Sequence, residues 1–158
     1  MLNKQRLQLE QTSIHFLSEQ DDYKHLLTLP GVGPIIALIV LAESGDLRRF
    51  KHYRQYINYC GFNLSGKQSG QKSAQYKLSK RGNSRLRYAF WLAAVNAIRQ
   101  TENSFRNKFE RYIKKDPNNP DLKRKGRVAV AVKLARVAHA LVKKGSDYRG
   151  YYEFGHGT

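Results

Sequence analysis

We predict an all-α fold from three features of the 158-residue sequence. Apolar residues recur every three or four positions along most of the chain, which is the spacing that buries one face of a helix. Residues that begin or end helices stand at the borders of these segments, among them Pro34, Gly45 and Asn83. Residues 61–82 are rich in Gly, Ser, Lys and Gln, which indicates one irregular basic loop in the middle of a small helical bundle.

Two helices are expected at the start of the chain. Residues 3–19 mix polar and apolar side chains without a proline, and they form a helix or part of one. Asp21 and Asp22 offer an N-cap for a second, short helix that ends near Leu27.

A tight turn and two further helices follow. The turn spans residues 29–34, and Pro34 fits the first turn of the next helix, where a missing N–H costs nothing. That helix is apolar almost all round, so we expect it to be buried, and Gly45 ends it. Another helix is predicted from Arg48 to Cys60. Its apolar and aromatic residues at helical spacing are Phe50, Tyr53, Ile57 and Cys60.

Three helices follow the basic loop, and their expected ranges are 84–100, 104–115 and 128–143. Asn83 caps the first of them, and Asn103 or Ser104 begins the second. A turn at 116–120 and a basic loop at 123–127 precede the third. This short basic loop is either a solvated surface or a phosphate contact, and the charge of the chain favours phosphate. The apolar face of the helix after Asn83 consists of Leu86, Phe90, Ala93 and Ala97.

The charge of the chain indicates a polyanionic partner. There are 29 Lys and Arg against 12 Asp and Glu, a formal net charge of +17. Residues 47–101 contain twelve of the basic residues and no carboxylate at all. Such a stretch repels itself in a compact fold unless a partner neutralises it, and nucleic acid is the most plausible partner. The alternative is a basic surface kept for solubility, although such surfaces normally intersperse both signs.

Several classes of protein are not expected. The longest apolar run, residues 35–42, is eight residues long, which is too short to span a membrane. The polar N-terminus does not read as a signal peptide. A single cysteine, Cys60, excludes an internal disulfide framework and is typical of a reducing cytosol, and its place at the apolar end of a helix predicts a core residue. The five histidines show no metal-ligand spacing.

The turn Leu-Pro-Gly-Val-Gly-Pro is the first candidate binding feature. Gly31 and Gly33 can take positive φ and bring bare backbone close to a ligand. The N–H groups of the turn and of the following helix start suit a phosphate oxygen, while Val32 folds back into the core. An ordinary helix-breaking turn without a ligand is the alternative. The pattern over residues 26–37 resembles the helix-hairpin-helix motif, a sequence-independent reader of DNA backbone.

The basic loop holds the second candidate. Ser69 lies between Lys67 and Lys72 and precedes Gly70, so its surroundings are positive and its backbone is uncluttered. Such surroundings suit a serine that attacks a phosphodiester, because cations stabilise the charged transition state. Spacing alone does not select this residue, because serine in a glycine-rich loop is more often a turn former.

Three tyrosines at helical spacing, Tyr53, Tyr56 and Tyr59, could stack on bases. Half-buried helix positions are the more frequent outcome of this spacing.

Four ordered blocks between about residues 26 and 148 resemble one protein family. The blocks are LPGVGPIIALIVLAESGDLRRFKHYRQYINYCGF, KQSGQKS, LSKRGNSRLRYAFWLAA and GRVAVAVKLARVAHALVKKG. They are similar to the C-terminal serine domain of insertion-sequence transposases that pair it with an N-terminal RuvC-like acidic domain, a family with bridge-RNA-guided recombinases among its members. The resemblance implies residues 1–22 as a helical linker, residues 23–148 as the transposase C-terminal domain, and residues 149–158 as a flexible tail.

The resemblance also implies roles for residues in these blocks. Ser69, followed by Gly70, matches the serine nucleophile that links to DNA. Lys80 and Arg81 lie where the loop meets the next helix, and they add side-chain charge to its N–H donors. The DNA-binding residues expected in the chain are Gly31, Val32, Gly33, Lys67, Gly70, Lys72, Lys80, Arg81, Arg85 and Arg87.

The partners that this resemblance implies are DNA, a guide RNA, an acidic RuvC-like domain in trans and a second copy of the chain. Glu43 and Asp46 are isolated and show no two-metal spacing, so no cofactor is expected on this chain, and Mg²⁺ is expected only with the acidic domain. Alone, the chain is expected to bind DNA in the bacterial cytosol without completing recombination. A non-catalytic DNA- or RNA-binding module and a truncated remnant remain alternatives.

Overall fold

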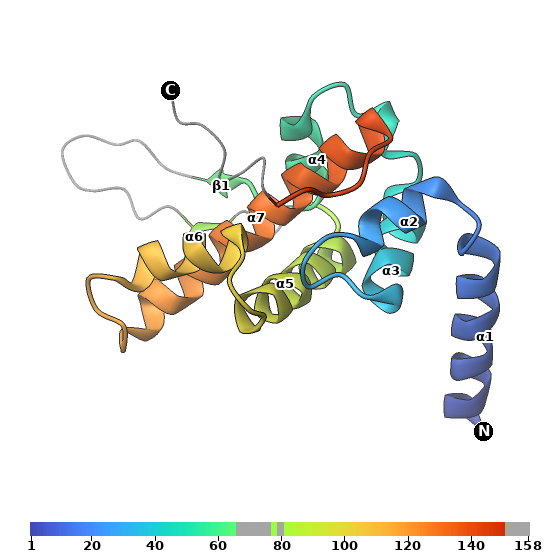
Figure 1. The fold of residues 1–158 in the computed structure, drawn as a ribbon, viewed down its shortest axis with the longest axis horizontal. Helices are drawn as coiled ribbons and strands as arrows, with labels where there is room; N and C mark the ends of the chain where they lie inside the picture. Colours follow the sequence, from blue (N-terminus) through green and yellow to red (C-terminus); the bar gives the residue numbers. More distant parts are fainter. Residues whose placement is uncertain (66–76, 79–80, 151–158) are drawn as a thin grey trace.

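The computed structural model describes residues 1–65, 77–78 and 81–150, and in these residues it is helical apart from one two-residue ladder (Figure 1). The predicted all-α class is confirmed. The helices are α1 (Leu2–Leu17), α2 (Asp21–Leu27), α3 (Pro34–Ser44), the 3₁₀ helix η1 (Leu47–Arg49), α4 (Tyr53–Tyr59), α5 (Ser84–Arg99), α6 (Ser104–Ile113) and α7 (Pro120–Lys144). The antiparallel ladder pairs β1 (Leu64–Ser65) with β2 (Lys77–Leu78).

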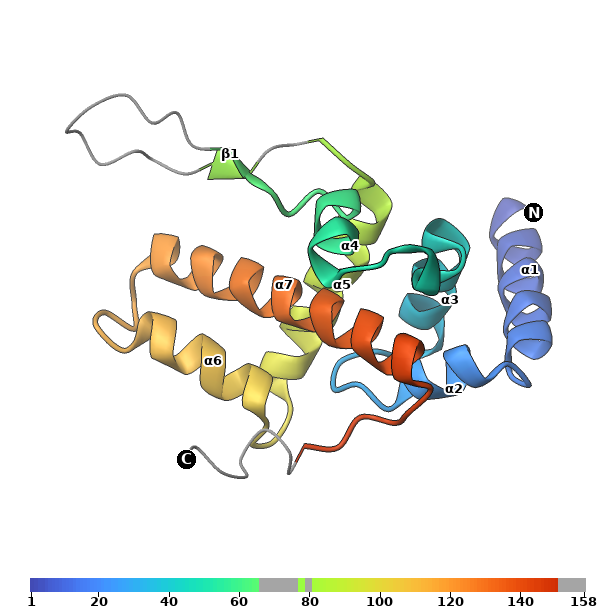
Figure 2. The ribbon, with the colours of Figure 1, turned by 90° about the horizontal axis from the view of Figure 1, so that it is seen from above.

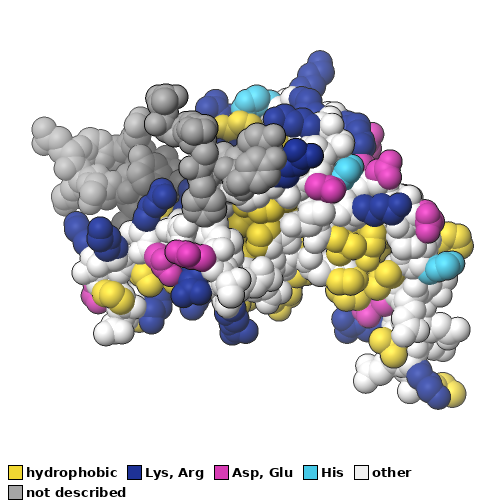
Figure 3. All heavy atoms as spheres, in the orientation of Figure 1, with side chains coloured by type: hydrophobic (Ala, Val, Ile, Leu, Met, Phe, Trp, Pro, Cys, Tyr) yellow, Lys and Arg dark blue, Asp and Glu magenta, His cyan; other side chains and the backbone are white. Residues whose placement is uncertain are grey.

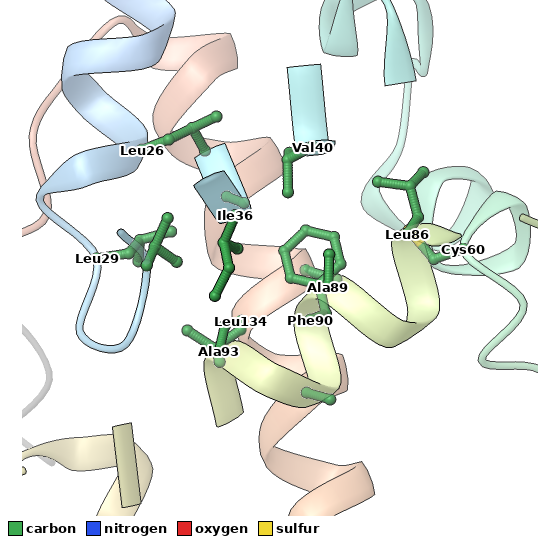
Figure 4. Packing of buried hydrophobic residues seen from close by; sticks show 14 of the residues in the cluster. Leu26, Leu29, Ile36, Val40, Cys60, Leu86, Ala89, Phe90, Ala93 and Leu134 are labelled. Carbon is green, nitrogen blue, oxygen red and sulfur yellow. The ribbon is translucent and has the colours of Figure 1, made fainter. Parts of the chain in front are cut away.

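The long helix α7 is the centre of the packing. It contacts α2, α4, α5 and α6, and α6 runs beside it in Figure 2. The predicted apolar face of α5 is fully buried, and alanines on both α5 and α7 let the helices approach closely. Figure 4 shows Phe90 and Ala93 of α5 lying among apolar side chains from α2, α3 and α7. Cys60 is also fully buried, as predicted.

Helix α1 lies at one end of the molecule, beside α3 (Figures 1 and 2). None of its residues is buried, although Ile14 and Leu17 pack partly against the core. In the part of the chain that the structure describes, no helix is both long and apolar enough to cross a membrane.

The predicted helix from Arg48 to Cys60 is wrong at its start, because two shorter helices replace it. Phe50 has extended backbone between η1 and α4, and its side chain is buried. His139 of α7 donates from Nε2 to the Phe50 carbonyl at 2.8 Å, so that carbonyl is satisfied outside any helix. Asp46 caps η1 and His52 caps α4.

Two helix starts also differ from the prediction. The N-cap of α2 is Gln20, whereas Asp21 and Asp22 lie in the first turn, where their charge is favourable to the helix dipole. The basic segment 123–127 is not a loop, because α7 already begins at Pro120, with Asn119 as its N-cap.

Candidate nucleic-acid interface

The two glycines of the turn between α2 and α3 differ in backbone geometry. Gly31 has a φ of +84°, whereas Gly33 has a φ of −99°, so only Gly31 uses the positive φ that is open to both. The reason is Pro34, since proline forces the preceding residue into extended backbone. Val32 is 8% exposed and folds into the core as predicted, and its N–H donates to the Leu29 carbonyl at 3.1 Å.

Gly31 faces α5 rather than an open space. A Cβ there would lie 2.1 Å from the Ala93 carbonyl oxygen and 2.7 Å from the Ala97 nitrogen. Asn96 also donates to the Gly31 carbonyl, at 3.4 Å. This glycine therefore allows the turn to pack on α5. A Cβ at Gly33 would meet nothing within 4 Å.

The open side of the turn retains unused donors. Among the described residues, the N–H groups of Gly33, Ile35 and Ile36 have no acceptor, as is usual at the start of a helix without a side-chain cap. An open hollow beside the turn is lined by residues 27–33 and, from α5, by Asn96, Arg99 and Gln100. Arg99 thus adds a cation beside the turn, and sequence signals do not predict it because only the packing of α5 brings it there.

A second group of residues lies at the base of the basic segment 62–80, and we call it the neck. It consists of residues 59–61 and 81–83. The Asn83 N–H donates to the Tyr59 carbonyl at 2.8 Å, and a Cβ on Gly82 would lie 2.6 Å from the Gly61 nitrogen. The two ends of the segment are therefore held together through their backbones.

The predicted residues of the basic segment divide into two sets. Five lie outside the described residues, namely Lys67, Ser69, Gly70, Lys72 and Lys80. The other three, Arg81, Arg85 and Arg87, lie in the neck or within four residues of it. The Arg81 carbonyl faces Gly61, and Arg87 donates to the Gly61 carbonyl at 3.5 Å.

The neck and the turn lie at opposite ends of α5. Arg85 is in the first turn of this helix, whereas Asn96 is near its end, so they are separated by about 16 Å along the axis. The structure therefore presents two separate candidate contacts. Figure 3 shows Lys and Arg side chains spread over the face in view, where Asp and Glu are fewer.

Glu43 joins α3 to the start of α5 through side-chain contacts that were not predicted from the sequence. Its carboxylate accepts from Asn83 Nδ2 at 2.8 Å and from Arg85 Nη1 at 3.1 Å. These two partners, Asn83 first, lower the pKa of Glu43. Tyr59 donates from its hydroxyl to the Glu43 carbonyl at 2.9 Å. Since Asn83 caps α5, Glu43 ties the end of α3 to the neck. No local signal predicts this contact, because its partners are forty positions away.

The three tyrosines of α4 differ in exposure. Tyr56 is fully buried and forms a hydrogen bond with Ser44 at 2.7 Å, so its ring is not available for a base. Tyr53 and Tyr59 are half-buried, as is usual for helix positions at this spacing.

Fold and site together define a basic helical protein that presents open backbone donors at a turn and clustered arginines at the base of a basic segment. A family model described as "Transposase IS116/IS110/IS902 family" matches residues 23–110. The chain is 31% identical over 129 residues to the transposase for insertion sequence element IS1111A of Coxiella burnetii, which covers 82% of this chain and 35% of that protein. A "Probable family 20 transposase" of Pseudomonas aeruginosa is 30% identical over 129 residues, with 80% and 37% covered.

The chain therefore belongs to the IS116/IS110/IS902 transposase family. It spans little more than a third of the length of these two curated relatives. The family match includes the turn and the neck, and α7 lies beyond it.

Proposed function

We propose that this chain is the DNA-binding C-terminal domain of a transposase that recombines the ends of an insertion sequence. The observation that supports this most is the α2–α3 turn, with open N–H groups at the positive end of α3. A helix-hairpin-helix uses such a turn to hold a DNA phosphate. Membership of a transposase family and the net charge of +17 support the same partner.

The proposed nucleophile is Ser69, which lies outside the described residues. Two observations support it. The KQSGQKS block resembles the serine motif of the transposase family, and positive residues surround the serine in the sequence. In the reaction, a bond forms between the serine Oγ and the phosphorus, and the bond from phosphorus to the leaving deoxyribose oxygen breaks. The serine proton ends on that leaving oxygen. The arginines at the neck would stabilise the charge that develops on the phosphate.

The remaining parts of the reaction are assigned to partners. In the described residues, no three His, Cys, Asp or Glu side chains lie close enough together to hold a metal ion. We assign Mg²⁺ to a RuvC-like acidic domain supplied in trans. A guide RNA and self-association complete the proposed complex, which acts on DNA in the cytoplasm.

The contact at the turn is tested with Gly33→Glu. A Cβ at this position meets no atom within 4 Å, and the charge of the new side chain repels phosphate. The affinity for duplex DNA should fall about tenfold, equally for unrelated sequences, as fluorescence anisotropy would measure. Gln11→Glu on the exposed face of α1 makes the same charge change far from the turn and is the matched control. An unchanged affinity of Gly33→Glu, or a change in sequence preference, contradicts backbone binding by the turn.

The nucleophile is tested in a complete reaction with donor DNA, the acidic domain and the guide RNA. Ser69→Ala should abolish the covalent protein–DNA product, whereas Ser73→Ala in the same segment should retain it. If Ser69→Ala leaves the covalent product unchanged, Ser69 is not the nucleophile, and a non-catalytic binding module is the better description of the chain.

A further inference from the structure

Helices α6 and α7 carry a cluster of cations that neither the turn nor the neck includes. Lys108 and Arg111 are three positions apart on α6, and Lys133 and Arg136 are three positions apart on α7, so each pair shares one face of its helix. The two helices pack along each other (Figure 2). We call these four residues the α6–α7 basic face.

The cations of this face repel one another. Burial lowers the pKa of Lys108, and the neighbouring Lys133, Arg136 and Arg111 lower it further, in that order. Like charges on two packed helices destabilise the free protein, and a bound polyanion relieves the repulsion.

Among the described residues, Lys108, Arg111 and Arg136 form no ion pair with a carboxylate. The acidic residues on the same two helices are engaged elsewhere. Glu110 pairs with Arg106 at 2.9 Å. Asp121 pairs with Arg124 at 2.6 Å and with Lys125 at 2.8 Å.

The positions of two of these cations are supported by neighbouring groups. Lys133 donates to the Ser104 hydroxyl at 3.0 Å and lies 4.8 Å from the centre of the Phe105 ring. The Arg136 guanidinium lies 5.8 Å from the centre of the Tyr53 ring, and Arg54 lies 6.0 Å from the same ring. Aromatic rings thus hold cations on this surface without cancelling their charge.

We propose that the α6–α7 basic face binds the phosphate backbone of duplex DNA, as a contact separate from the turn and the neck. This inference rests on the proposed function, which makes DNA the substrate. Lys108, Arg111 and Arg136, which form no ion pair among the described residues, fit a row of phosphates, since one strand presents a charge about every 3.4 Å along the axis. The face extends the DNA contact to α7, which the family match does not reach.

The test is the salt dependence of duplex binding by the double variant R111Q/R136Q. Both side chains are exposed, and neither forms an ion pair among the described residues, so the fold should persist. Each lost phosphate contact lowers the slope of log K against log salt by about 0.9, so the double variant should lose about 1.8. The matched control is R6Q/R106Q, which removes the same charge at two arginines that already pair with carboxylates.

The proposal is overturned if the two double variants lose the same slope, because net charge alone would then explain binding. It is also overturned if R111Q/R136Q binds duplex DNA like the parent chain while Gly33→Glu does not, an outcome that leaves the proposed function standing. If R111Q/R136Q loses binding only to duplex RNA or only to polyglutamate and keeps its binding to duplex DNA, the face binds a different partner and the proposal is wrong. A parent chain that does not bind duplex DNA would overturn the proposed function itself.

Discussion

The backbones of Gly61 and Gly82 lie directly against each other. A Cβ on Gly82 would come within 2.6 Å of the Gly61 nitrogen and 2.7 Å of the Gly61 Cα. The Asn83 N–H donates to the Tyr59 carbonyl beside this contact. The basic segment that contains Ser69 therefore begins and ends at one point, immediately before the first turn of α5.

Gly82→Ala should destabilise the protein more than Gly145→Ala. Both glycines have positive φ, +104° and +64°, so both variants bear a backbone strain of about 1–2 kcal/mol. Only Gly82 also meets backbone atoms, and the resulting displacement should cost about 1–3 kcal/mol more. Urea denaturation of both variants measures the difference. Equal destabilisation would show that the neck tolerates a side chain.

Replacing the two glycines of the α2–α3 turn with alanine should change the free energy of unfolding by very different amounts. Gly31→Ala places a methyl group 2.1 Å from the Ala93 carbonyl at a positive φ, so it should cost more than about 2 kcal/mol. Gly33→Ala meets nothing and has extended backbone, so its effect should stay within about 1 kcal/mol and can be stabilising. Thermal and urea unfolding test this order, and a tolerated Gly31→Ala would contradict the packing of the turn on α5.

The link between Glu43 and Asn83 should make stability depend on pH. The pKa of Glu43 is lowered in the folded chain, so its carboxylate stabilises the fold above the ordinary pKa of about 4.3. This contribution is lost as the pH falls through the lowered value. Glu43→Gln should therefore cost up to about 1 kcal/mol at pH 7, and the cost should shrink towards pH 3. Urea titrations at several pH values, with Glu19→Gln as the control, measure it. A cost that does not change with pH would contradict the ionic link.

The thiol of Cys60 should not react in the folded protein. The side chain is fully buried, and burial raises its pKa to about 12, so almost no thiolate exists at pH 8. A disulfide reagent such as Ellman's reagent should modify Cys60 only after denaturant unfolds the chain. Rapid reaction under native conditions would contradict the burial of this residue.

Local signals predicted most helices correctly because caps and apolar spacing act over a few residues. Asn83 accepts from the N–H groups of Arg85 and Leu86, as an N-cap should, and α5 follows. The segment around Phe50 was different, since its buried carbonyl bonds to His139, which is far away in the sequence. Local periodicity predicted a helix that continues through Phe50. In the structure the contact with His139 holds Phe50 in extended backbone instead.

The sequence by itself determined the all-α class, the positions of most helices and the concentration of positive charge, because all three depend on nearby residues or on composition. Only the tertiary structure decided that Gly31 serves packing against α5, that Glu43 binds the cap of α5, and that Lys108 lies among cations from two helices. These relations join residues that are far apart in the chain, and packing alone brings them within contact distance.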